Sequence, residues 1–270
     1  MKYLELYENW NPLSDEDFAN AQELHSIGVV SDQELEDLVR LKQIQHRIIN
    51  YKGGWLSLDL SFCTLLTGLP AGLTVNGFLD LTACTGLTGL PAGLVVKDYL
   101  NLTDCTSLES LPAGLKVKDG LLANGCTSLR SLPAGLVISG GLELNHCTSL
   151  ESLPTGLVVG SYLNLNGCIK LGELPQDLKV GGSIHASGCK SLKSLPAGLM
   201  VNGTLNLNNC TALESLPAGL RVNGVLSLVN CTSLKSLPQD LVVGGYLELK
   251  GCTELGELPQ GLNVVGKIYR

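Results

Sequence analysis

Hydrophobic and polar positions repeat with a 21-residue period from residue 56 onwards. One unit, GGLELNHCTSLESLPTGLVVG at 140–160, holds seven apolar positions: two Leu in an alternating segment, one Cys, three further Leu and one Val. The alternating Leu142-Glu143-Leu144 predicts a β-strand, because successive strand side chains point to opposite faces. The segment Leu153-Pro154-Thr155-Gly156 predicts a tight turn, since proline and glycine favour turn geometry.

A proline and a cysteine mark every unit, with no insertion between units. The prolines are Pro70, Pro91, Pro112, Pro133, Pro154, Pro175, Pro196, Pro217, Pro238 and Pro259, and each cysteine lies seven residues before its proline. A fixed period in this range is typical of a solenoid, in which each coil buries its apolar side chains against its neighbours. The period therefore predicts ten stacked coils over residues 55–270.

Residues 1–54 lack the repeat and predict two helices. Ser14 followed by three acidic residues predicts a helix start, and Gly28 predicts its end. Ser31 and Glu34 form a capping-box pattern for a second helix. Its apolar stripe is Leu35, Leu38, Leu41, Ile44 and Ile48.

We expect this hairpin to cover the Leu side chains of the first coil, because the terminal units of a solenoid need a polar outer face. Trp55 is expected to pack at the junction, and Tyr3–Tyr7 to add a short edge strand. The alternative is that the hairpin dimerises.

The unit LxLxxCxxLxxLPxxLxV resembles the short bacterial leucine-rich repeat in its LPxxL portion. In its Cys followed by Leu three residues later, it is similar to the cysteine-containing repeats of plant immune receptors. The resemblance covers residues 56–265 and departs from the commonest pattern by placing Cys where Asn usually forms a ladder. It implies a β-rich solenoid: a right-handed superhelix of ten 21-residue coils with parallel strands, capped by the α-helical hairpin. It also implies that a partner binds the outward strand surface.

Ten evenly spaced cysteines could pack in the core, pair as disulfides or bind metal. One Cys per coil makes a line with a spacing of about 4.8 Å, whereas a zinc site needs ligands that converge on one point. Core packing is therefore favoured, and we expect neither a metal site nor a cofactor.

The outward strand positions, six and four residues before each Cys, vary more than the rest of the repeat. Tyr beside Asn or Glu on a rigid sheet is typical of recognition surfaces, although exposed strand positions can also drift, with Tyr retained for its β-propensity. The candidate partner-binding residues are Phe78, Asp80, Tyr99, Asn101, Glu143, Tyr162, Asn164, His185, Asn206, Tyr246 and Glu248.

Two other columns have simpler interpretations. Thr follows Cys in eight coils, which raises a remote ice-binding hypothesis, but the neighbouring column is not a second Thr row. Four residues after each Cys, Glu alternates with Arg or Lys across several coils, which predicts a solvated charge ladder. The four histidines have no repeated acid or nucleophile partner and no catalytic motif is present, so we expect no enzyme.

Charge and composition narrow the classes of partner and the cellular locations that we expect. The formal net charge is −7, and residues 1–50 hold ten acidic against four basic side chains, so a nucleic-acid partner is not expected. No apolar run approaches a membrane span or an export signal. The sequence predicts a cytoplasmic, non-enzymatic protein-binding module. It could serve as a bacterial effector, delivered into a host by a non-classical route, or as a scaffold. Self-association, end to end or through the hairpin, is the alternative.

Overall fold

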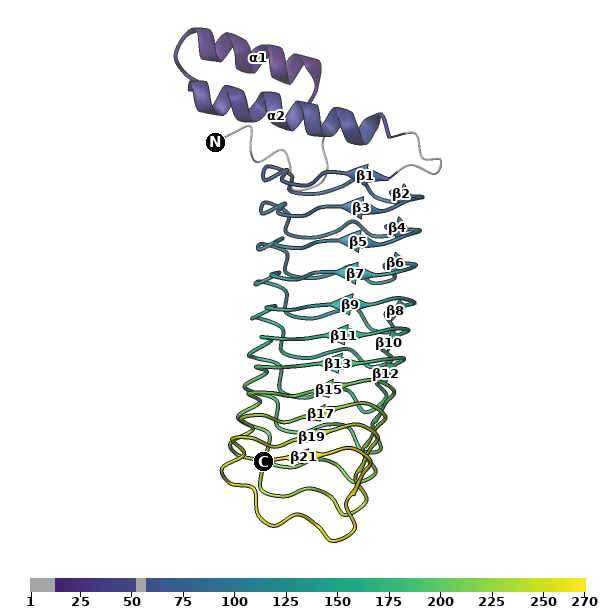
Figure 1. Cartoon of the computed structure of the whole chain (residues 1–270). Coiled ribbons are helices and arrows are strands. Elements are labelled where there is room, and N and C mark those ends of the chain that lie inside the picture. The colour runs from purple at the N-terminus through teal and green to yellow at the C-terminus, as the bar shows by residue number, and fades with distance from the viewer. Residues whose placement is uncertain (1–12, 52–56) are drawn as a thin grey trace.

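The structure is a computed structural model that describes residues 13–51 and 57–270. It is a β-solenoid of about ten turns, with two helices lying across its N-terminal end (Figure 1). Each turn contributes one strand to each of two sides of the stack. The solenoid and its helical hairpin are therefore confirmed.

Odd-numbered strands form one continuous parallel sheet. Each strand from β1 to β19 begins at a buried residue and pairs with the strand one coil later, as Leu142 does with Leu163. In the described part of the chain this sheet has eleven strands: β1(Leu58–Asp59), β3(Leu79–Asp80), β5(Leu100–Asn101), β7(Leu121–Leu122), β9(Leu142–Glu143), β11(Leu163–Asn164), β13(Ile184–His185), β15(Leu205–Asn206), β17(Leu226–Ser227), β19(Leu247–Glu248) and β21(Ile268–Tyr269).

Even-numbered strands come from the LxV segment and run along a second side of the stack (Figure 1). Among residues 57–270 they divide into three separate parallel sheets, with breaks after β6 and after β12. The strands are β2(Thr74–Val75), β4(Val95–Val96), β6(Lys116–Val117), β8(Val137–Ile138), β10(Val158–Val159), β12(Lys179–Val180), β14(Met200–Val201), β16(Arg221–Val222), β18(Val242–Val243) and β20(Asn263–Val264).

The seven apolar columns converge on one interior, as the pattern predicts. In the coil around Cys147 the two strand Leu, the Cys and the following Leu150 have no exposed surface, and Val159 is 1 % exposed. A continuous cluster of such residues runs from Ile44 in the hairpin to Leu249 in the tenth coil. Ala123 and Ala186, which replace Leu in the second strand column, are equally buried.

The cysteines are all free thiols, and those before Cys252 are buried. Cys147 Sγ donates a hydrogen bond to the carbonyl oxygen of Ala123 in the preceding coil, at 3.0 Å. The same bond recurs for every cysteine from Cys84 to Cys252. The thiols therefore link neighbouring coils as well as fill the core, and the packing interpretation of the cysteines is confirmed.

A left-handed residue precedes every cysteine and turns the strand into the core. The φ angle at this position is positive in all ten coils, for example 61° at His146 and 71° at Gly125. Asn, Asp and Gly tolerate this region, which accounts for Asp104, Asn209 and four glycines at the position. His146 therefore occupies a turn position.

The hairpin consists of α1 (Asp15–Ser26) and α2 (Asp32–Ile49), and both capping boxes are formed. Ile44 and Ile48 of α2 join the solenoid core. The Arg47 guanidinium donates to the carbonyl oxygen of Asp59, at the edge of the first coil. The cap interpretation is thus supported by direct packing. The expected Tyr3–Tyr7 strand and the packing of Trp55 lie outside the described residues.

Candidate functional site

The outward side chains of the odd-numbered strands form what we call the odd-strand face. Its columns lie six, four and two residues before each Cys. Most of these side chains are half-buried, and Tyr162 and Tyr246 are exposed, at 36 % and 49 %. Ser227 is the exception, since it is buried. The columns predicted to face solvent therefore do so along nearly the whole sheet.

An aromatic pair lies at the N-terminal end of this face. The rings of Phe78 and Tyr99, on adjacent strands, stack in parallel with centroids 5.0 Å apart. Each ring is half-buried. Stacked rings of this kind lose little further conformational entropy when they contact a ligand.

A second cluster surrounds Tyr162 at the centre of the face. Its hydroxyl donates to Glu143 Oε1 at 2.9 Å, and Asn124 Nδ2 donates to Glu143 Oε2 at 2.6 Å. The ring leans over Gly141, where a Cβ atom would collide with it. The hydrogen bond to Glu143 raises the pKa of Tyr162 above its usual value. Tyr162 is consequently held in one orientation while it stays partly exposed.

A third cluster lies at the C-terminal end. The rings of Tyr246 and Tyr269 meet edge to face with centroids 5.8 Å apart. On the neighbouring strands, Ser227 Oγ lies 2.5 Å from Glu248 Oε2 and 2.7 Å from Asn208 Oδ1. Sequence reasoning missed Tyr269 because it follows the last cysteine, although it lies one full repeat period after Glu248.

Several candidate residues also have a local structural role. Asp80 Oδ1 accepts from the backbone N–H of Thr82, and Asn101 and Asn206 accept from the N–H two residues later in the same way. These side chains satisfy backbone donors that the strand leaves unpaired. Asp59 Oδ1 likewise accepts from the Ser61 hydroxyl at 2.7 Å and from the Ser61 N–H at 2.9 Å. These two hydrogen bonds, the hydroxyl one first, lower the pKa of Asp59. The acceptor atoms of this column are thus partly used within the fold.

The asparagines two residues before Cys accept hydrogen bonds from backbone N–H groups of the neighbouring coil. Asn124 Oδ1 accepts from Asn145 N, and Asn145 Oδ1 accepts from Asn166 N, each at 3.0 Å. The relay continues from Asn166 to Ser187 N. Sequence reasoning missed this column, although the in-phase asparagines at 124, 145, 166 and 208 were its signal.

The remaining candidates, Asn164 and His185, lie side by side on adjacent strands. Both are half-buried, and the Oδ1 atom of Asn164 is buried without a hydrogen-bond partner. The face therefore brings most of the candidate residues together in three aromatic or acidic clusters along one sheet. It is a continuous surface and not a convergent pocket.

The charged column, four residues after each Cys, and the Thr row, one residue after it, both lie outside the odd-strand face. The charge column contains one ion pair within 4 Å among the described residues, between Lys235 and Glu214 at 3.0 Å. The Thr row is mostly exposed, with Thr148 and Thr232 half-buried. The ice-binding hypothesis stays a prediction.

Comparison with protein-family models and with curated protein sequences finds no match. In the described ranges, no three His, Cys, Asp or Glu side chains gather in a way that could hold a metal ion. Neither described helix is long and apolar enough to cross a bilayer. The side chains of the odd-strand face are consequently the basis for a proposed function.

Proposed function

We propose that the protein is a non-enzymatic binding module that holds a partner protein against its odd-strand face. The observation that carries this proposal is the set of exposed or half-buried aromatic rings at Phe78, Tyr99, Tyr162 and Tyr246, fixed on one hydrogen-bonded sheet. Tyrosine supplies large contact area with few rotatable bonds, and it is enriched at interaction hot spots.

The fixed orientation of Tyr162 supports the same interpretation. Its hydroxyl is bound to Glu143 and its ring occupies the space left by Gly141. A side chain ordered before association loses less entropy on binding. The acidic side chains on the face, Asp80, Glu143 and Glu248, favour a partner with basic groups around an apolar centre.

The finer description rests on the repeat pattern. LxLxxCxxLxxLPxxLxV resembles the leucine-rich repeat, and we propose that the solenoid belongs to this class. The resemblance to the short bacterial kind is the support for a role as a bacterial effector or scaffold acting in a cytoplasm.

Alanine substitution of the two central tyrosines tests the proposal. We expect Tyr99→Ala with Tyr162→Ala to reduce capture of a specific partner from lysate at least tenfold, since each hot-spot aromatic contributes about 2 kcal/mol. Lys193→Ala, on the edge of the coil, is the matched control and should capture the partner normally. Circular-dichroism melts should be alike for all three proteins. Equal recovery by the tyrosine variant and by the control would contradict the proposal.

Self-association is the second candidate, and the exposure of the last coil favours it. Val265 is 77 % exposed. Ile268 is 41 % exposed, whereas Ile184 and Leu247, which hold the same place in earlier coils, are buried. Among the described residues β21 pairs with β19 alone, and a strand edge of this kind can pair with another chain. Light scattering at several concentrations tests this candidate: a mass that rises with concentration and falls in Val265→Lys supports it, and a constant monomer mass overturns it.

A further inference from the structure

The side of the stack formed by the even-numbered strands, which we call the even side, is interrupted at two places. Each intact junction on this side has two backbone hydrogen bonds between successive coils, such as that from Arg221 N to Leu199 O at 3.0 Å. Among residues 57–270, no backbone bond of this kind joins β8 to β6 or β14 to β12, so that Met200 N does not donate to Leu178 O. The two breaks therefore lie three coils apart, after β6 and after β12.

The odd-numbered sheet, in contrast, is continuous across the same coils. Next to the second break, Ile184 N donates to Thr204 O at 2.9 Å. The thiol bond of Cys210 crosses the same junction, and a bond from Gly203 N to Gly182 O, at 3.2 Å, lies at the corner between the two sides. Equivalent bonds of all three kinds join the coils at the first break. Successive coils are thus held together on the odd-numbered side at both breaks.

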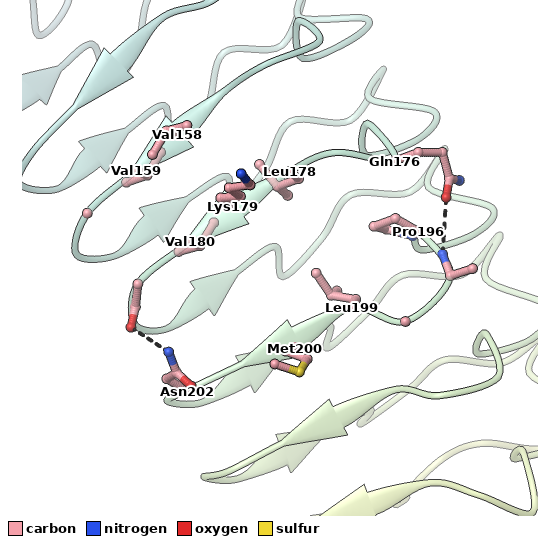
Figure 2. Close-up of a pocket in the computed structure, with 14 residues that line it drawn as sticks. Val158, Val159, Gln176, Leu178, Lys179, Val180, Pro196, Leu199, Met200 and Asn202 are labelled. Atoms are coloured by element: carbon pink, nitrogen blue, oxygen red, sulfur yellow. Dashed lines mark hydrogen bonds between the residues drawn. The ribbon is translucent and has the colours of Figure 1, made fainter.

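A groove lies over each break, with a volume of about 390 Å³ at the first and about 490 Å³ at the second (Figure 2). The core beneath the second groove is slightly open: Leu178 and Val180 are 8 % and 9 % exposed, whereas Leu157, at the place of Leu178 one coil earlier, has no exposed surface. Leu115, which lines the first groove, is 7 % exposed. The coils are therefore packed less closely at the two breaks than at the intact junction of β10 and β12.

Two exposed side chains bridge the second break in place of the missing backbone bonds. Gln176 Oε1 accepts from Ala197 N at 3.2 Å. Asn202 Nδ2 donates to Gly181 O at 3.1 Å. Figure 2 shows Gln176 and Asn202 at opposite ends of the groove. Because exposed hydrogen bonds exchange with bonds to water at little net cost, these bridges permit the break to open and to close.

The breaks also fall between the aromatic clusters of the odd-strand face. Phe78 and Tyr99 lie before the first break, and Tyr162 lies between the two breaks. Tyr246 and Tyr269 lie after the second. Each of the three segments of the solenoid thus carries one cluster, so a change of angle at a break changes how neighbouring clusters face a partner.

We propose that the two breaks are hinges at which the solenoid bends, with the odd-numbered sheet as its continuous spine. When coils part on the even side, the stack curves away from that side, and no backbone bond between even-numbered strands has to be broken. The three aromatic clusters then turn relative to one another, so the hinges set the angles at which the clusters meet a partner. This use of the hinges rests on the proposed function of the odd-strand face, whereas the bending does not.

Double electron–electron resonance on the full chain measures the bending. Spin labels are attached through a ketone-bearing amino acid in place of Thr74 and of Asn263, so that the native thiols stay unlabelled. Both positions are exposed and lie on β2 and β20, nine strand spacings or roughly 43 Å apart. We expect a broad distribution of distances in this chain, because opening of either hinge lengthens the even side.

Disulfides across both breaks should close the hinges. The pairs are Lys116→Cys with Val137→Cys and Lys179→Cys with Met200→Cys, at exposed positions that hold the same place in successive coils. One coil spacing, about 4.8 Å, is within the Cα separation that a disulfide spans. We expect the distribution to become roughly twofold narrower when both hinges are closed, and to widen again on reduction. Reduction breaks no native disulfide, since the native cysteines are free thiols.

The matched control places two disulfides at intact junctions of the even side. Its pairs are Val95→Cys with Lys116→Cys and Val158→Cys with Lys179→Cys, which lie in register on adjacent strands. This control should leave the distribution as broad as it is without disulfides. Equal narrowing by the control, or a distribution that is already narrow before oxidation, would overturn the hinges. Capture of a partner plays no part in these measurements, so a failure of the proposed function would produce neither result.

Discussion

At the scale of the residue, the cysteine combines packing with hydrogen bonding. Each thiol from Cys84 onwards fills the core and donates to a carbonyl oxygen one coil away, 3.0–3.1 Å from the sulfur. Burial raises the pKa of the Cys84 and Cys147 thiols to about 12, so the reactive thiolate is disfavoured. A cysteine thiol is smaller than an amide side chain, so it fits among the core side chains and still donates this hydrogen bond.

Replacement of a central cysteine tests this role. Cys147→Ala removes the sulfur and leaves the Ala123 carbonyl oxygen with only its longer bond from Cys126 N, at 3.4 Å, so we expect a loss of roughly 1–3 kcal/mol in the free energy of unfolding. Cys252→Ala, at a half-buried position, should cost less. Urea unfolding measures both variants. A cost below about 0.5 kcal/mol at position 147 would contradict this role of the buried thiol.

At the scale of the element, the helical hairpin covers the first coil with apolar side chains and hydrogen-bonds to it, as each coil does for the one that follows. Ile44 and Ile48 extend the core, and Arg47 donates to the Asp59 carbonyl oxygen. Tyr51 Oη accepts from Asn76 N at 3.2 Å, on the other side of the first coil. The end of the stack is thus closed by both apolar and polar contacts.

Truncation of Arg47 should loosen the first coil selectively. We expect Arg47→Ala to speed hydrogen exchange in β1 and β3 and to cost roughly 1–2 kcal/mol, because it leaves a carbonyl at the edge without its charged donor. Arg40→Ala, on the same helix but paired with Glu36 in solvent, is the control and should change stability by about 0.5 kcal/mol or less. Identical exchange in the two variants would contradict the capping role.

The sequence predicts the features that recur in every coil, and it does not predict the hydrogen bonds that polar groups make within and between coils. The apolar columns, the Cys line and the turn at Leu153–Gly156 with its repeats were predictable, because identical side chains at a fixed interval must share one environment. The breaks after β6 and β12 were not predictable, since the LxV pattern continues across them unchanged. The capping roles of Asp80 and Asn101 depend on backbone donors that a pattern of side chains does not show.

At the scale of the whole molecule, the line of buried thiols should make the free energy of unfolding fall as the pH rises above the usual pKa of a cysteine. A raised native pKa means that the folded chain retains protons which the unfolded chain releases, so stability is fully present below pH 9 and is lost between about pH 9 and pH 12. One pH unit above 9, each such thiol lowers the free energy of unfolding by on the order of 1 kcal/mol. Several of them act together.

We therefore expect the urea midpoint to fall steeply between pH 9 and pH 10.5. Thiolate absorbance near 240 nm should stay low in the folded chain over this range and rise on unfolding. A constant midpoint, or thiols that titrate near pH 9 in the folded protein, would contradict the buried ladder.

Site-specific photo-crosslinking tests directly whether the odd-strand face makes the functional contact. A benzophenone side chain would replace Tyr99, Tyr162, Lys193 on the coil edge, or Met200 in β14 on the other side of the solenoid, one at a time. We expect one partner to crosslink from positions 99 and 162 and not from position 193, whatever position 200 captures. A partner that crosslinks from position 193 as strongly as from the two tyrosine positions would contradict it.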